Sequence, residues 1–149
     1  MKRVLVLHGL GMNMRGKVKQ SVFGKATLPE YDAAIRSHST ELGISVDIFQ
    51  SNIEGELVNK LYAGEEEGID GAIINPAGFT IGYRGLTVAI DQVGFPVVEV
   101  HVSNPLTRGL ISEVGKFAAA QVTGFGLDGY RVALIGLSAL IDAKSARSA

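Results

Sequence analysis

Hydrophobic residues recur along the chain in five short runs, and each run is separated from the next by a longer stretch of mixed character. The runs are mostly apolar and rich in β-branched residues, as expected for strands of a parallel sheet that is covered on both faces. We expect the strands to span Val4–Leu7, Ile44–Phe49, Gly71–Ile74, Pro96–Val102 and Ala118–Thr123.

The stretches between these runs carry helical signals. Thr27 to Glu30 form a capping box with a proline early in the helix, and Gly43 ends the pattern, so a helix is predicted over residues 28–42. A second capping box, Ser51 to Glu54, precedes an expected buried stripe of Leu57, Leu61 and Tyr62.

Two further helices are predicted over residues 85–93 and 128–141. Alternation of strand and helix is typical of an α/β protein, because parallel strands need the long crossover connections that helices supply. We therefore expect one flavodoxin-like domain over residues 1–141, a three-layer sandwich with a five-stranded parallel sheet of order 2-1-3-4-5. Residues 142–149 are small and polar, and we expect them to be a disordered tail.

Composition narrows the range of functions. The 149 residues include 14 basic and 15 acidic side chains, so no cationic surface for a nucleic acid is expected. The absence of cysteine excludes disulfides and thiolate metal sites, and the scattered His8, His38 and His101 lack metal-ligand spacing. The first apolar run is too short for a signal peptide or a membrane span, so we expect a cytoplasmic protein without a membrane partner.

Ligands of doubly wound sheets bind beyond the carboxyl ends of the strands. After the first predicted strand, the segment Gly9–Lys25 is too long to serve only as a connection. One hypothesis is a cationic lid over an anionic ligand, and the alternative is a solvated, mobile loop. The basic residues of this segment are Arg15, Lys17, Lys19 and Lys25.

The predicted fourth strand carries the most informative polar pattern. Glu99, His101 and Ser103 are two residues apart and can share a face of the strand. A carboxylate beside an imidazole orients it for general acid or base work, although a purely structural pair is the alternative.

Asn75, at the end of the third strand, can donate to and accept from a ligand. The Gly9-Leu10-Gly11 turn lacks the remaining dinucleotide fingerprint, so no nucleotide or other cofactor is expected.

Four stretches, in order and almost without gaps from Val4 to Leu137, resemble the type II 3-dehydroquinate dehydratases. They comprise residues 49–57, 73–76, 96–104 and 124–133. The resemblance implies a flavodoxin-like fold, a small carboxylate ligand and a homo-oligomer, either a trimer or a dodecamer of trimers. It also implies an anti elimination of water in which a tyrosine, activated by an arginine, removes a proton and a histidine supported by glutamate protonates the leaving hydroxyl.

The acid half of this chemistry matches the chain. The resemblance assigns the acid to His101 and its partner to Glu99. It assigns ligand holding to Asn75, Val102 through its backbone, Ser103 and Arg108. The family's tyrosine, lid arginine, first-loop asparagine, second histidine and second arginine fall instead on Phe23, Val18, Gly11, Ile81 and Ser112.

The nearby polar residues indicate how such a site could be rebuilt. Our hypothesis is that Tyr83 or His8 replaces the base and that Arg84 or Arg15 clamps the anion. The alternative is that Tyr83 and Arg84 merely start a helix and pack on a neighbouring subunit.

Three functions therefore compete. The first is a divergent lyase or isomerase that uses His101 on a small hydroxy or oxo acid, with dehydroquinate dehydration weak or absent. The second is a 3-dehydroquinate dehydratase with a relocated base. The third is a non-catalytic carboxylate-binding relative, because a shared fold does not by itself establish a shared function.

Overall fold

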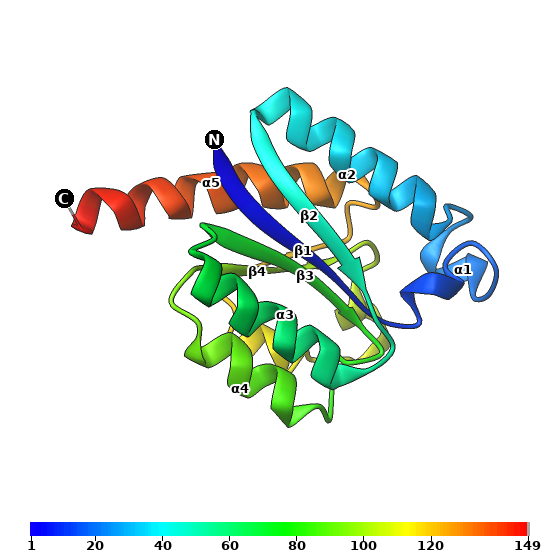
Figure 1. Cartoon of the computed structure of the whole chain (residues 1–149). Coiled ribbons are helices and arrows are strands. Elements are labelled where there is room, and N and C mark those ends of the chain that lie inside the picture. The colour runs from blue at the N-terminus through cyan, green and yellow to red at the C-terminus, as the bar shows by residue number, and fades with distance from the viewer. Residues whose placement is uncertain (149) are drawn as a thin grey trace.

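A computed structural model describes residues 1–148 of the chain and leaves Ala149 outside the described residues. Five parallel strands form one sheet in the order β2-β1-β3-β4-β5, which confirms the predicted flavodoxin-like topology (Figure 1). The strands are β1 (Lys2–Leu10), β2 (Ile44–Gln50), β3 (Gly71–Ala77), β4 (Val97–His101) and β5 (Ala120–Thr123).

Helices cover both faces of the sheet (Figure 1). On one face lie α2 (Leu28–Leu42) and α5 (Asp128–Ser148), and on the other lie α3 (Glu54–Glu67) and α4 (Arg84–Gln92). Alternation along β1 sends Val4 and Val6 into the first apolar layer and Leu5 and Leu7 into the second. The central strands β1, β3 and β4 are largely buried because helices pack on both of their faces, whereas the edge strands β2 and β5 keep several exposed side chains.

The segment after β1 is more ordered than the sequence indicates. β1 continues through Leu10, since His8 is still in register with Gln50 and Asn75. A 3-10 turn over Met12–Met14 and the short helix α1 (Gln20–Phe23) follow. Gly16 has a φ of +80°, and a Cβ there would lie 2.7 Å from the Lys25 carbonyl oxygen, so the middle of the segment packs against its carboxyl end.

The first predicted cap is confirmed and the second is wrong. The Thr27 hydroxyl accepts from the Glu30 backbone N–H at 3.4 Å and donates to the Glu30 carboxylate at 3.1 Å. At α3 the cap position is Ile53, whereas the Ser51 hydroxyl donates to the carboxylate of Glu56 in the first turn of the helix.

The stripe on α3 is also narrower than predicted. Tyr62 is 38% exposed, while Leu57 and Leu61 are buried as expected. The phenol of Tyr62 reaches across to α4, where it donates to the Gln92 side-chain oxygen at 2.5 Å. A residue adjacent to Leu61 is rotated by about 100° around the helix, away from the core.

The predicted tail belongs to a helix, since α5 continues from residue 142 to Ser148. Alanine, lysine and arginine are strong helix formers, and small polar composition alone does not distinguish such a segment from a frayed end. Lys2 pairs with Asp142 at 3.1 Å, and the Lys144 ammonium donates to the Gly94 carbonyl. Within residues 1–148, no helix has both the length and the apolar character that crossing a bilayer requires.

Substitution of Thr27 by alanine should destabilise the fold by about 1 kcal/mol, because it removes the cap of α2. Chemical denaturation would measure the change in the free energy of unfolding. Ser37→Ala, at an exposed position of the same helix, is the matched control. Equal stabilities for the two variants would contradict the assigned role of Thr27.

Candidate functional site

A cavity of about 410 Å³ opens at the carboxyl ends of β1, β3 and β4. The segment after β1 supplies one wall, and the segment after β4, which begins with a 3-10 turn over Pro105–Arg108, supplies the opposite wall. The lining residues are Leu10, Gly11, Met14, Arg15, Val18, Phe23, Ala77, Gly78, Thr80, His101, Pro105, Arg108 and Leu110. This is the edge of the sheet at which the strand order predicts a ligand.

His101 lies in the wall of this cavity and is held by a buried carboxylate. Its Nε2 is 3.0 Å from Oε2 of Glu99, a residue that is completely buried in the middle of β4. Because an ionised carboxylate only accepts, Nε2 must donate to it. The other ring nitrogen, Nδ1, is then the one left to exchange a proton with a ligand.

Two further side chains donate to Glu99, and neither was predicted to do so from the sequence. The Ser112 hydroxyl donates to Oε2 at 2.5 Å, and the Gln121 amide donates to Oε1 at 2.6 Å. Gln121 is the β5 residue in register with Glu99, so a polar residue within the neighbouring predicted strand was the available signal. Ser112, on an irregular segment, offered none.

Opposing effects act on the pKa of Glu99. Burial by itself raises this pKa, but hydrogen bonds from His101, Ser112 and Gln121 and the charge of His101 outweigh it. The net pKa therefore lies below the ordinary value, and the group remains a carboxylate at neutral pH. The carboxylate fixes the orientation of the imidazole.

Gly115 makes this arrangement sterically possible. A Cβ at position 115 would lie 2.1 Å from the Gln121 Nε2 atom and 2.9 Å from Oε1 of Glu99. The backbone of the 3-10 turn Val114–Lys116 therefore approaches the amide and the carboxylate more closely than any residue with a side chain permits.

Two arginines supply positive charge to the cavity. Arg15 is only 7% exposed, and its Cζ lies 3.5 Å from the centroid of the Phe23 ring. Arg108 donates to the Ser103 hydroxyl at 3.2 Å and lies 5.7 Å from the same ring. Burial lowers the pKa of Arg15 against the opposing effect of Tyr31 and Tyr130, and the charge of Arg108 lowers it further.

Asn75 shapes the floor of the cavity but does not line it. Its side-chain N–H donates to the Tyr130 hydroxyl at 3.0 Å, and its oxygen accepts from the Ala77 N–H at 3.2 Å. Ala77 has a φ of +48°, which is unfavourable for a residue with a Cβ. The Asn75 bond supports this strained turn at a position that does line the cavity.

The structure does not bring the proposed replacement base to the cavity. His8 is buried beneath it, with Nε2 2.9 Å from the Asp32 carboxylate, inside β1 rather than at its end. Tyr83 caps α4 and packs edge-on against Phe79 at 4.7 Å. Burial raises the pKa of Tyr31 and Tyr130, so these two phenols stay protonated.

Two more of the residues predicted to bind the ligand, Arg84 and Val102, do not line the cavity. Arg84 is exposed as the first residue of α4, which agrees with the simpler interpretation that it starts a helix. Val102 is buried in the layer under α2 and α5, and its carbonyl accepts from Gly126 at 2.9 Å. Of the proposed clamps, the structure places Arg15 at the cavity and not Arg84.

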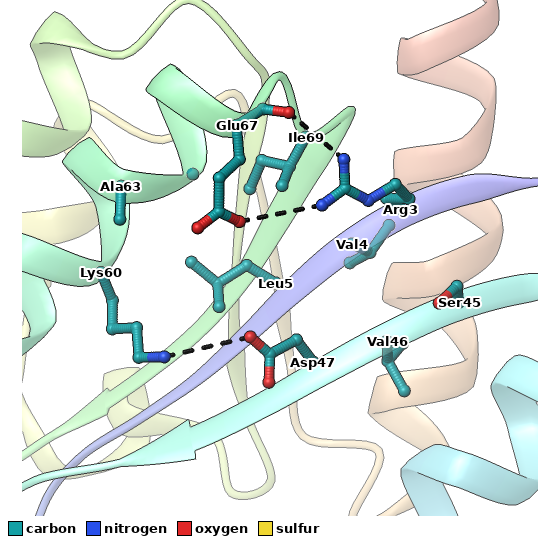
Figure 2. Close-up of a pocket in the computed structure, with 11 residues that line it drawn as sticks. Arg3, Val4, Leu5, Ser45, Val46, Asp47, Lys60, Ala63, Glu67 and Ile69 are labelled. Atoms are coloured by element: carbon teal, nitrogen blue, oxygen red, sulfur yellow. Dashed lines mark hydrogen bonds and ion pairs between the residues drawn. The ribbon is translucent and has the colours of Figure 1, made fainter.

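Figure 2 shows a second, smaller cavity of about 220 Å³ near the amino ends of β1 and β2. Its charged side chains pair with one another: Arg3 with Glu67 at 3.7 Å, and Lys60 with Asp47 at 4.0 Å. It has no spare charge for a ligand. Within residues 1–148, no three histidine or acidic side chains gather to form a metal site.

Comparison with known proteins identifies close relatives. Residues 2–138 match the family Dehydroquinase class II. The chain is 41% identical over 144 residues to the 3-dehydroquinate dehydratase of Syntrophotalea carbinolica, covering 95% of this chain and 97% of that protein. It is 39% identical over 146 residues to the 3-dehydroquinate dehydratase of Pelobacter propionicus, covering 96% and 98%.

Solved structures with a similar fold include two with related names. The type II dehydroquinase from Butyrivibrio crossotus superposes with a TM-score of 0.88 at 28% identity, covering 92% of this chain and 97% of that one. A 3-dehydroquinate dehydratase-like protein from Bifidobacterium longum gives 0.73 at 26% identity, covering 95% and 99%.

Substitution of Glu99 by glutamine should destabilise the protein at neutral pH by about 1–3 kcal/mol, because it mispairs a buried network of donors. The folded-state pKa of Glu99 lies below the ordinary value of 4.5, so the carboxylate's contribution is present above that pH and is lost as the pH falls. The difference in unfolding free energy between wild type and variant should therefore shrink below pH 4.5.

Denaturant unfolding between neutral and acidic pH would measure this difference. Glu66→Gln, at an exposed position on α3, is the control and should show no such pH dependence. A constant difference across the acidic range would contradict the lowered pKa of Glu99.

Proposed function

The chain belongs to the type II dehydroquinase family, and on that premise we propose that it binds 3-dehydroquinate and dehydrates it with His101 as the general acid. The names of the full-length relatives support this substrate. The observation that carries the proposal is the Glu99–His101 pair, which opens on a cavity with two arginines.

In this proposal the residues divide the work. Arg15 and Arg108 hold the substrate carboxylate, because each lines the cavity and neither is paired with an acid within residues 1–148. His101 gives its Nδ1 proton to the leaving hydroxyl. Glu99 is a positioning residue that fixes the ring. General acid catalysis of this kind typically contributes about 10²–10⁴-fold.

The cavity is less well equipped for the step that removes the substrate proton. Phe23 stands where the resemblance implies a tyrosine, and a phenyl ring cannot accept a proton. Thr80 already donates its hydroxyl to the Ala77 carbonyl at 2.5 Å. We infer that dehydration is slow compared with that of the relatives, because His101 is the one imidazole among the residues that line the cavity and no carboxylate or phenol lines it.

Phe23 also favours two other candidate functions. A divergent lyase or isomerase that needs only one acid–base residue, or a non-catalytic relative that only binds a carboxylate, would retain the arginines and dispense with the phenol. Both candidates share the same carboxylate site, so turnover of 3-dehydroquinate separates them from the main proposal.

Mixing the protein with 3-dehydroquinate and following the ultraviolet absorbance of the conjugated product tests the proposal. We expect slow conversion that falls by about 10²-fold or more in His101→Ala. His38→Ala, on α2, is the matched control and should retain the wild-type rate. Binding without conversion would favour the carboxylate-binding candidate, and equal rates for both variants would remove His101 from the mechanism.

Restoring a phenol should speed the reaction. In Phe23→Tyr the new hydroxyl would stand beside the Arg15 guanidinium, which already covers the ring at 3.5 Å and would lower the phenol pKa. We expect an increase in kcat/KM of about tenfold or more. Phe49→Tyr is the control, because Lys60 covers that ring at 4.8 Å and neither residue lines the cavity. No gain in Phe23→Tyr would contradict the assignment of the missing base to position 23.

A further inference from the structure

The cavity contains more positive charge than the protein neutralises. Arg3 and Arg131 each pair with a glutamate, but within residues 1–148 neither Arg15 nor Arg108 has an acidic partner. The polar contacts of Arg15 and Arg108 are neutral: the Met12 sulfur for Arg15, at 3.2 Å from Nε, and the Ser103 hydroxyl for Arg108. An almost fully buried guanidinium without a counter-charge is unfavourable unless an anion joins it.

Apolar side chains line the cavity beside this charge. The Phe23 ring has the Arg15 guanidinium 3.5 Å from its centroid and that of Arg108 at 5.7 Å. Leu10, Val18 and Leu110 continue the apolar lining. A planar ring attached to a carboxylate could place its charge on the arginines and its face on these side chains.

The same lining offers few hydrogen-bond partners to a ring with many hydroxyls. Of the thirteen lining residues, only Arg15, Thr80, His101 and Arg108 have polar side chains. The Thr80 hydroxyl donates to the Ala77 carbonyl, and the arginines are donors without acceptor capacity. Ring hydroxyls buried against leucine, valine and phenylalanine would lose their water without gaining a partner.

We propose that this cavity binds flat, unsaturated or aromatic ring carboxylates in preference to saturated, polyhydroxylated ones. The inference rests on the carboxylate site of the proposed function but not on its turnover. Phe23 is then the specificity-determining residue, and Arg15 supplies the charge. A dehydration product, which has lost a hydroxyl and gained a carbon–carbon double bond, is closer to the preferred class than its substrate.

Calorimetric titration with benzoate, cyclohexanecarboxylate and quinate tests the preference. Benzoate should bind about tenfold or more tightly than quinate, with cyclohexanecarboxylate between them, because these acids differ in flatness and in hydroxyl count. Benzoate that binds no better than quinate, or that does not bind, overturns the proposal.

Single substitutions test the roles assigned to Phe23 and Arg15. Phe23→Leu should weaken benzoate toward the cyclohexanecarboxylate value and leave quinate unchanged, whereas Arg15→Gln should weaken every acid. Arg36→Gln, at an exposed position on α2, should change nothing. Thermal melting confirms that each variant is folded, and uniform loss in Phe23→Leu overturns its role in specificity.

The outcomes are separable from those of the turnover assay. Benzoate binding without conversion of 3-dehydroquinate would contradict the proposed dehydratase and support this inference. Conversion of 3-dehydroquinate together with tighter binding of quinate would do the reverse.

Discussion

A carboxylate buried inside a parallel strand is the constraint on which the carboxyl edge of this sheet depends. Glu99 sits among valines in β4, and its charge is tolerable only because three side chains donate to it. Those donors come from β4 itself, from the segment before β5 and from β5. The glycine at position 115 allows the backbone to approach them. The carboxylate thus couples the last two strands to the orientation of one imidazole.

A second polar layer supports the cavity without lining it. His8, Asp32, Asn75 and Tyr130 bond or pack with one another beneath the ends of β1 and β3. Burial keeps the Tyr130 phenol protonated, and that phenol accepts from Asn75. Asn75 in turn holds the Ala77 N–H at a strained turn. Polar residues at strand ends can therefore support the backbone of a site, while other side chains line its cavity.

Two segments of the chain supply the arginines and the Phe23 ring of the cavity. The segment after β4 brings Arg108, whose guanidinium rests on Ser103. The segment after β1 brings Arg15 and the ring that it covers. Because the two segments belong to different crossovers, the charge at the site requires the sheet order that places β1, β3 and β4 side by side.

Much of the architecture follows from local sequence. The five apolar runs and their alternation with helical signals predicted the strands and the α/β class, and Thr27 marked the start of α2, because periodicity and capping act over a few residues. The expected flavodoxin-like strand order for such an alternation is the one observed. The spacing of Glu99 and His101 likewise sufficed to pair them. Composition was misleading where tertiary contacts compensate for it, as at buried His8 within β1 and at the helical residues 142–148.

Only the tertiary structure decided which polar side chains meet in one place. Arg15 and Arg84 are equally basic in the sequence, yet one lines the cavity and the other begins an exposed helix turn. Ser112 and Gln121 reach Glu99 from 13 and 22 residues away, contacts that no local pattern records. Sequence periodicity tells which face of an element a residue occupies, but the crossing of separate elements determines what that face meets.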